Sequence, residues 1–102
     1  MTSSTVELRL SPATSVAVSD DTLTVDLADG RSISAPLEWF PRLAHASPAE
    51  RGNWQIGGDG SGVRWPDLDE DISVEGLLAG RPSGESQKSL KRWLDQRAGI
   101  NK

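Results

Sequence analysis

The chain has 102 residues, four tryptophans, no cysteine and a net charge of −4. This length favours one small domain, and the lack of cysteine excludes disulfides, thiolate nucleophiles and cysteine-based zinc sites. No segment has the apolar length of a signal peptide or a membrane span, so we expect a cytoplasmic protein that does not bind a membrane.

Alternating apolar residues predict strands in the first third of the chain. Residues 6–10 alternate apolar and charged side chains, which indicates an edge strand. Residues 14–35 repeat the pattern around turns at residues 20–21 and 28–30, where glycine permits a positive φ. They predict a three-stranded antiparallel meander with one buried face.

The middle of the chain predicts short helices followed by a hairpin. Residues 36–52 have helical spacing, and Ser47 with Glu50 has the pattern of a capping box. Residues 53–65 form two short apolar runs around the glycine-rich stretch 57–62. This arrangement predicts two strands joined by a glycine-rich loop.

Two helices are predicted in the last third. Ser73 is placed to cap a short helix over residues 74–79, residues 81–85 have the composition of a linker, and a last helix is expected over residues 86–98. The apolar stripe of this last helix consists of Leu90, Trp93 and Leu94.

These elements predict an α+β fold. Residues 1–80 form the α+β domain, a small antiparallel sheet made of the meander and the hairpin with short helices on one side. Residues 81–102 add a linker and a basic amphipathic C-terminal helix.

An acidic run follows Trp65 and precedes the helix at residue 74. Asp67, Asp69 and Asp71 have the spacing of the start of a calcium loop, but Ile72 and Leu78 stand where such a loop needs glycine and glutamate. We therefore predict no metal and no cofactor, and interpret the run as an acidic turn at a helix start, where negative charge complements the dipole.

A small enzyme that uses Asp67, Asp69 or Glu70 is a further hypothesis. It requires a buried acid with a raised pKa beside a well-formed pocket. The single histidine, His45, falls near a predicted helix end. No lysine or histidine partner lies near the acids in the sequence, and the serine that follows them, Ser73, is placed to cap a helix. The sequence predicts no catalytic residues and no enzyme.

Charge is segregated along the chain. Residues 87–102 hold five basic residues and one acidic residue, so they carry +4 and the other 86 residues carry −8. The basic helix presents Lys88, Lys91, Arg92, Trp93 and Arg97. Such a helix can bind an acidic partner, follow a nucleic-acid backbone, or pack on its own acidic domain.

Four runs carry a family resemblance: LADGRSI (27–33), PLEWFPRL (36–43), AER (49–51) and GVRWPDLDEDISVEGLL (62–78). In order and spacing they resemble the bacterial family of domain of unknown function 2442. Genes of that family often neighbour a small gene of the domain of unknown function 4160 family, in an arrangement like a toxin–antitoxin pair, and some relatives add a helix-turn-helix domain. The resemblance implies a small α+β module that binds a partner or regulates, and it supplies no catalytic residues. After residue 80 this chain has room for one helix and not for a helix-turn-helix domain, which argues against operator recognition by the chain alone.

We therefore predict a non-enzymatic protein-interaction or regulatory module, in its most specific form the antitoxin-like member of a small bacterial pair. The expected partner is a small basic protein, with a second copy of the chain as another possibility. A nucleic-acid-binding regulator that uses the C-terminal helix is the alternative. The predicted partner-binding residues are Trp39, Trp65, Asp67, Asp69, Glu70 and Asp71.

Overall fold

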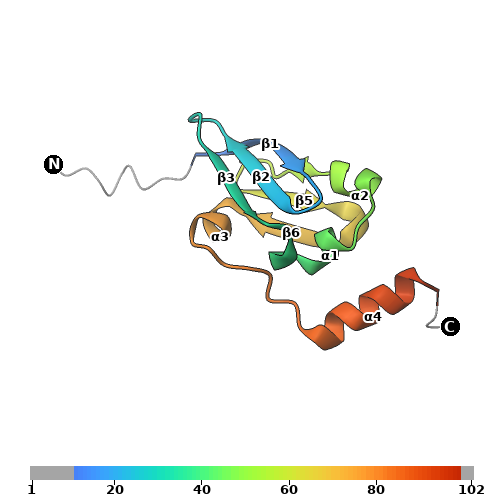
Figure 1. Ribbon diagram of the computed structural model, residues 1–102. Coiled ribbons are helices and arrows are strands. Elements are labelled where there is room, and N and C mark those ends of the chain that lie inside the picture. Colours follow the sequence, from blue (N-terminus) through green and yellow to red (C-terminus); the bar gives the residue numbers. More distant parts are fainter. Residues whose placement is uncertain (1–10, 100–102) are drawn as a thin grey trace.

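The computed structural model describes residues 11–99 and places two three-stranded antiparallel sheets face to face (Figure 1). The first sheet has the order β1 (Ala13–Val18), β2 (Thr22–Leu27), β3 (Ser32–Pro36). The second has the order β4 (Gln55–Ile56), β5 (Gly62–Trp65), β6 (Glu70–Ser73). Both sheets contribute to one apolar core, and the α+β fold predicted from the sequence is confirmed. The strand predicted at residues 6–10 lies outside the described residues.

The first sheet follows the predicted meander. Its central strand buries Leu23, Val25 and Leu27 and leaves the residues between them partly exposed, as the two-residue period of a strand requires. In the second turn Gly30 has a φ of 94°, a conformation that costs glycine little.

Short helices connect the two sheets: η2 (Leu37–Trp39), α1 (Pro41–Ala44) and α2 (Pro48–Gly52). At the start of α2 the Ser47 hydroxyl accepts a hydrogen bond from the Glu50 amide, and the Glu50 carboxylate accepts one from the Ser47 amide. The predicted capping box is therefore present, and such a cap stabilises a helix by about 1 kcal/mol.

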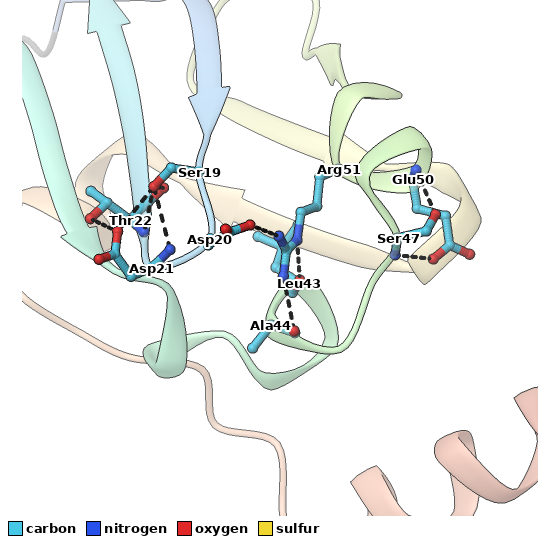
Figure 2. A network of polar contacts seen from close by, with 9 residues as sticks. All are labelled: Ser19, Asp20, Asp21, Thr22, Leu43, Ala44, Ser47, Glu50 and Arg51. Carbon is cyan, nitrogen blue, oxygen red and sulfur yellow. Dashed lines mark hydrogen bonds and ion pairs between the residues drawn. The ribbon is translucent and has the colours of Figure 1, made fainter.

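Arg51 links these helices to the first sheet through hydrogen bonds and an ion pair (Figure 2). Its guanidinium donates to the carbonyl oxygens of Leu43 and Ala44, each at 3.0 Å, and lies 3.5 Å from the carboxylate of Asp20. The two carbonyls belong to the end of α1, where backbone acceptors lack helical partners. One side chain of α2 thus supplies hydrogen-bond donors to the last carbonyls of α1 and also approaches the β1–β2 turn.

The predicted glycine-rich hairpin joins β4 to β5. Gly60 in its loop has a φ of 77°, and a Cβ atom there would collide with Pro12. The Gly60 carbonyl accepts a hydrogen bond of 2.8 Å from the Ala13 amide. The loop therefore holds the start of β1, and this close approach of two backbones requires glycine.

The acidic run differs from the prediction because half of it is a strand. Pro66–Leu68 forms the short helix η3, Asp69 takes the left-handed conformation with a φ of 51°, and the chain then enters β6. In β6 Ile72 is buried opposite Val63 of β5. A strand of four residues with one buried aliphatic side chain is too short to show a detectable alternation in the sequence.

Two helices end the described chain: α3 (Val74–Leu78), capped by Ser73, and α4 (Gln87–Arg97), capped by Ser86. The segment between α3 and α4 has no regular structure over residues 81–86, and α4 lies beside the sandwich, past α1 (Figure 1). Of the helices within residues 11–99, none combines the length and the apolar character needed to cross a membrane.

Candidate functional site

The acidic segment, residues 67–71, projects carboxylates from one corner of the second sheet. Leu68 is fully buried and anchors η3, and the left-handed Asp69 turns the chain into β6. Asp67, Asp69 and Asp71 are consequently exposed. In β6, which begins at Glu70, successive side chains point to opposite faces of the sheet. Glu70 therefore points away from the side of Asp69 and Asp71.

Arg64 is the main cation beside these exposed carboxylates. Its guanidinium donates to Asp71 at 2.7 Å and to Asp69 at 3.0 Å, and the bond to Asp69 raises the pKa of Arg64. Asp67 accepts a hydrogen bond of 2.9 Å from the neutral Asn53 amide. Asp69 and Asp71 thus share one guanidinium and Asp67 bonds to a neutral amide, so the three exposed carboxylates outnumber the guanidinium bonded to them.

Glu70 lies half-buried at a groove between β6 and the segment after α3. We call this the edge groove. It has a volume of about 270 Å3 and is lined by the four residues of β6, by Phe40, Gly76 and Leu77, and by residues 81–84.

Burial raises the pKa of Glu70 to about 7. The positive charge of Arg42 acts against this shift, and the negative charges of Glu85, Asp71 and Asp69 add to it. Arg42 cannot neutralise Glu70 fully because its guanidinium donates to the Glu85 carboxylate and to the carbonyl of Leu68. Desolvation therefore outweighs attraction, and Glu70 is only partly ionised at neutral pH.

A carboxyl group with a raised pKa beside a cavity meets one requirement of acid–base catalysis. A second requirement is an activated group aligned with it. The two serine hydroxyls of the edge groove already serve the backbone: Ser73 accepts from the Gly76 amide and Ser83 from the Glu85 amide. His45 lies at the C-terminal end of α1 and does not line this groove. The groove therefore combines an acid of raised pKa with two serine hydroxyls that accept hydrogen bonds from the backbone.

The C-terminal helix packs against its own domain through Trp93. The Trp93 ring lies between two guanidiniums, with Arg42 at 5.1 Å and Arg97 at 4.6 Å from its centroid. Stacking of this kind contributes about 0.5–2 kcal/mol for each cation. Trp93 also packs against the core as a partly buried side chain.

Two ion pairs hold the ends of this contact. Arg97 donates two hydrogen bonds to Glu50, at 2.8 and 2.9 Å, and these bonds lower the pKa of Glu50 to about 2. Arg42 pairs with Glu85, which also accepts from the Ser89 hydroxyl. Of the five side chains predicted to contact a partner or nucleic acid, Trp93 and Arg97 are therefore engaged within the chain.

The remaining three residues of that set, Lys88, Lys91 and Arg92, are exposed. Lys91 lies 3.1 Å from Asp95 of the same helix. The sequence contains no local signal for Arg42, Glu50 or Glu85 as docking residues, since their partners are 43 and 47 residues away.

Trp65 corrects one prediction. We expected it at a contact surface, but it is fully buried, and its indole N–H donates to the Arg51 carbonyl at 3.0 Å. Its position in β5 points it into the core, so it stabilises the fold and cannot reach a partner. Trp39 is half-buried against the core, and its carbonyl accepts from the Ser83 amide. Its predicted contact role stays a prediction.

Metal binding has no geometric support in the described part of the chain. Within residues 11–99 no three side chains of histidine, aspartate or glutamate lie close enough together to hold an ion. The exposed carboxylates of the acidic segment are paired with Arg64 and Asn53 instead.

With this geometry established, the chain can be placed among known proteins. Residues 13–83 match the family described as "Protein of unknown function (DUF2442)", and the chain belongs to this family. No protein of established annotation matches the chain.

Two solved structures have a similar fold. One is a protein of unknown function from Rhodospirillum rubrum, 28% identical, with a TM-score of 0.65 over 78% of this chain and 98% of that one. The other is an uncharacterised protein from Chromobacterium violaceum, 23% identical, with a TM-score of 0.65 over 97% of this chain and 86% of that one. The second similarity concerns the fold alone.

Proposed function

We propose that this chain is a protein-interaction module that binds a small basic protein through the acidic segment. The observation that carries the proposal is the group of exposed carboxylates at one corner of the second sheet, where Asp69 and Asp71 share the guanidinium of Arg64 and Asp67 bonds to the neutral Asn53 amide. Complementary charge of this kind steers a basic partner and fixes its orientation.

The same surface argues against self-association through this corner. A second copy would bring the same carboxylates to a symmetric contact, where like charges oppose each other. This repulsion would be present in a homodimer and absent from a complex with a basic partner.

The alternative is a nucleic-acid-binding regulator that uses α4. It is supported by the exposure of Lys88, Lys91 and Arg92. It is weakened by the pairing of Arg97 with Glu50, which neutralises one of the four basic side chains of the helix. Duplex DNA binding that falls steeply with salt and is lost in K88Q/K91Q/R92Q would favour this alternative.

In its most specific form, the module is the antitoxin-like member of a two-gene pair. This form follows from the family resemblance. Co-expression tests it: the chain should relieve growth inhibition caused by the small protein encoded next to it.

Affinity capture from the native host, with charge-matched variants, tests the general proposal. We expect the wild-type chain to recover a small basic protein and D67N/D69N/D71N to recover at least about tenfold less, because removing close opposite charges weakens a complex by 1.4 kcal/mol or more. Asparagine tolerates the left-handed conformation at position 69.

D21N/E38Q/E75Q is the control, since it removes three negative charges from exposed positions away from the acidic segment. It should recover the partner like the wild type. Equal recovery by the two triple variants, or no basic partner for the wild type, would refute the proposal.

A further inference from the structure

We propose that the free edge of β6 binds an extended segment of the basic partner as an added strand, with a lysine or arginine of that segment on Glu70. This inference rests on the proposed function and deepens it, since it names the part of the partner that is recognised. It also assigns a role to the edge groove, which takes no part in binding through the exposed carboxylates alone.

The first support is the position of β6 in the sheet. Within residues 11–99, β6 pairs with β5 on one side only, and the edge groove runs along it, lined by all four of its residues. An unpaired strand edge offers backbone donors and acceptors to an extended peptide. The other edge strands are less available: α3 packs against β3, α2 and β4 pack against β1, and β4 has two residues.

The second support is the chemistry of Glu70. Its carboxyl group is half-buried at the edge groove, and Arg42 directs its hydrogen bonds to Glu85 and Leu68. A peptide cation in the groove would supply the charge-assisted bond that the fold does not provide. Side chains of an added strand alternate, so every second residue of the peptide would lie on the face of the sheet that carries Glu70, and one of them would lie beside it.

The third support is that ionised Glu70 lowers the stability of the folded state. Because burial raises the pKa of Glu70 to about 7, ionising this side chain at neutral pH destabilises the fold. A neutral glutamine would avoid that destabilisation. Polar groups that cost stability are commonly found where binding requires them.

Charge decides which chain occupies the edge. Pairing β6 with β6 of a second copy would place two copies of Glu70 and Asp71 within one short ladder, and like charges across strands are destabilising. A basic segment pairs with the same two acids, which outnumber Arg81, the one cation among the lining residues of the groove. The occupant is therefore a cationic extended peptide.

The probe for the experiment is the capped peptide acetyl-Thr-Arg-Thr-Lys-Thr-Arg-Thr-amide, added to the full chain at pH 8. We expect amide chemical-shift changes at residues 70–73, 81, 83 and 84, and none from the matched peptide with glutamates in place of the basic residues. E70Q should weaken binding about tenfold, the scale of one charge-assisted hydrogen bond. E75Q removes an exposed charge from α3 outside the groove and should bind within about twofold of the wild type.

N-methylated probes separate strand pairing from simple charge attraction. Methyl groups on alternate peptide nitrogens block one edge of an extended peptide and leave the other edge free. One of the two alternately methylated probes should lose binding, and the other should keep it. Equal binding of both, or of the acidic peptide, would overturn the inference. So would a stable dimer whose contact includes residues 70–73.

The failure of this inference is distinguishable from the failure of the proposed function. If the captured partner is lost in D67N/D69N/D71N but retained fully in E70Q, the proposed function stands and the strand-addition inference fails. If neither variant affects capture, both fail.

Discussion

Neighbouring acids of the same charge have different environments in this protein. Asp69 and Asp71 point outward to Arg64, whereas Glu70 between them is half-buried at the edge groove. The period of a strand accounts for the contrast, because successive side chains leave opposite faces of a sheet. The register of β6 with β5 therefore decides which carboxylate is desolvated.

Replacing Glu70 with glutamine should change stability in a pH-dependent way. The folded-state pKa of about 7 lies above the ordinary value of 4.5, so the fold favours the protonated acid. The stability contributed by protonated Glu70 is fully present below pH 4.5 and is lost as the pH rises through 7. We expect E70Q to exceed the wild type by about 1–3 kcal/mol in the free energy of unfolding at pH 8.

Urea unfolding at pH 8 and pH 5 measures this difference, which should nearly vanish at pH 5. E75Q serves as the control, since Glu75 is exposed and should show no such trend. A wild-type chain that is as stable as E70Q at pH 8 would show that Glu70 is solvated.

The helix α4 is attached to the sandwich largely by polar contacts. Trp93 is its partly buried contact with the core, and ion pairs at Glu50 and Glu85 complete the docking. Partly exposed pairs contribute about 1 kcal/mol or less each. We infer that α4 opens more easily than the strands that share the apolar core.

Breaking the Glu50–Arg97 pair should loosen α4 without unfolding the sandwich. In E50Q the glutamine retains the capping bond to the Ser47 amide but loses the charge. We expect amide protons of α4 to exchange about fivefold faster, which corresponds to about 1 kcal/mol, while those of β2 keep their rates.

Acid should produce the same loosening in the wild-type chain. The lowered pKa of Glu50 means that its contribution is present above pH 4.5 and is lost as the pH falls toward 2. K91Q is the control, because Lys91 pairs within α4 and does not touch the sandwich. Unchanged exchange in E50Q would mean that Trp93 and the contacts of Glu85 position the helix without the Glu50–Arg97 pair.

In the whole molecule, folding brings some of the basic and acidic residues that are separated along the chain into ion pairs. The basic C-terminal helix meets acids of the domain at Glu50, and the linker acid Glu85 meets Arg42 of α1. The acidic segment is left with its excess of negative charge. The acids that dock α4 are therefore different from those of the proposed partner surface, although Arg92 and Trp93 of α4 line a pocket together with Asp67 and Asp69.

Shortened chains test how far the sandwich depends on α4. The family match ends at residue 83, before α4 begins, and we expect chains 1–84 and 1–86 both to unfold cooperatively. Chain 1–86 should lose about 1–2 kcal/mol of stability with Trp93, and chain 1–84 about 1 kcal/mol more, because its Arg42 lacks Glu85. Calorimetry or urea unfolding measures these losses. An unfolded 1–86 chain would make α4 part of the core domain.

Local sequence patterns were sufficient for most elements of this fold. Apolar alternation predicted the meander, glycines predicted the β4–β5 hairpin, and Ser47 and Ser73 predicted helix starts that the structure confirms. These features depend on neighbours within a few residues, and such neighbours are visible in one sequence.

Long-range contacts decided the rest. No local pattern distinguishes the buried Trp65 from an exposed tryptophan, or Glu70 from the acids beside it. The strand character of residues 70–73 depends on pairing with β5, and the docking of α4 depends on partners more than forty residues away. Burial and charge pairing are properties of residues brought together in space, so the accessible surface of this protein follows only from its tertiary structure.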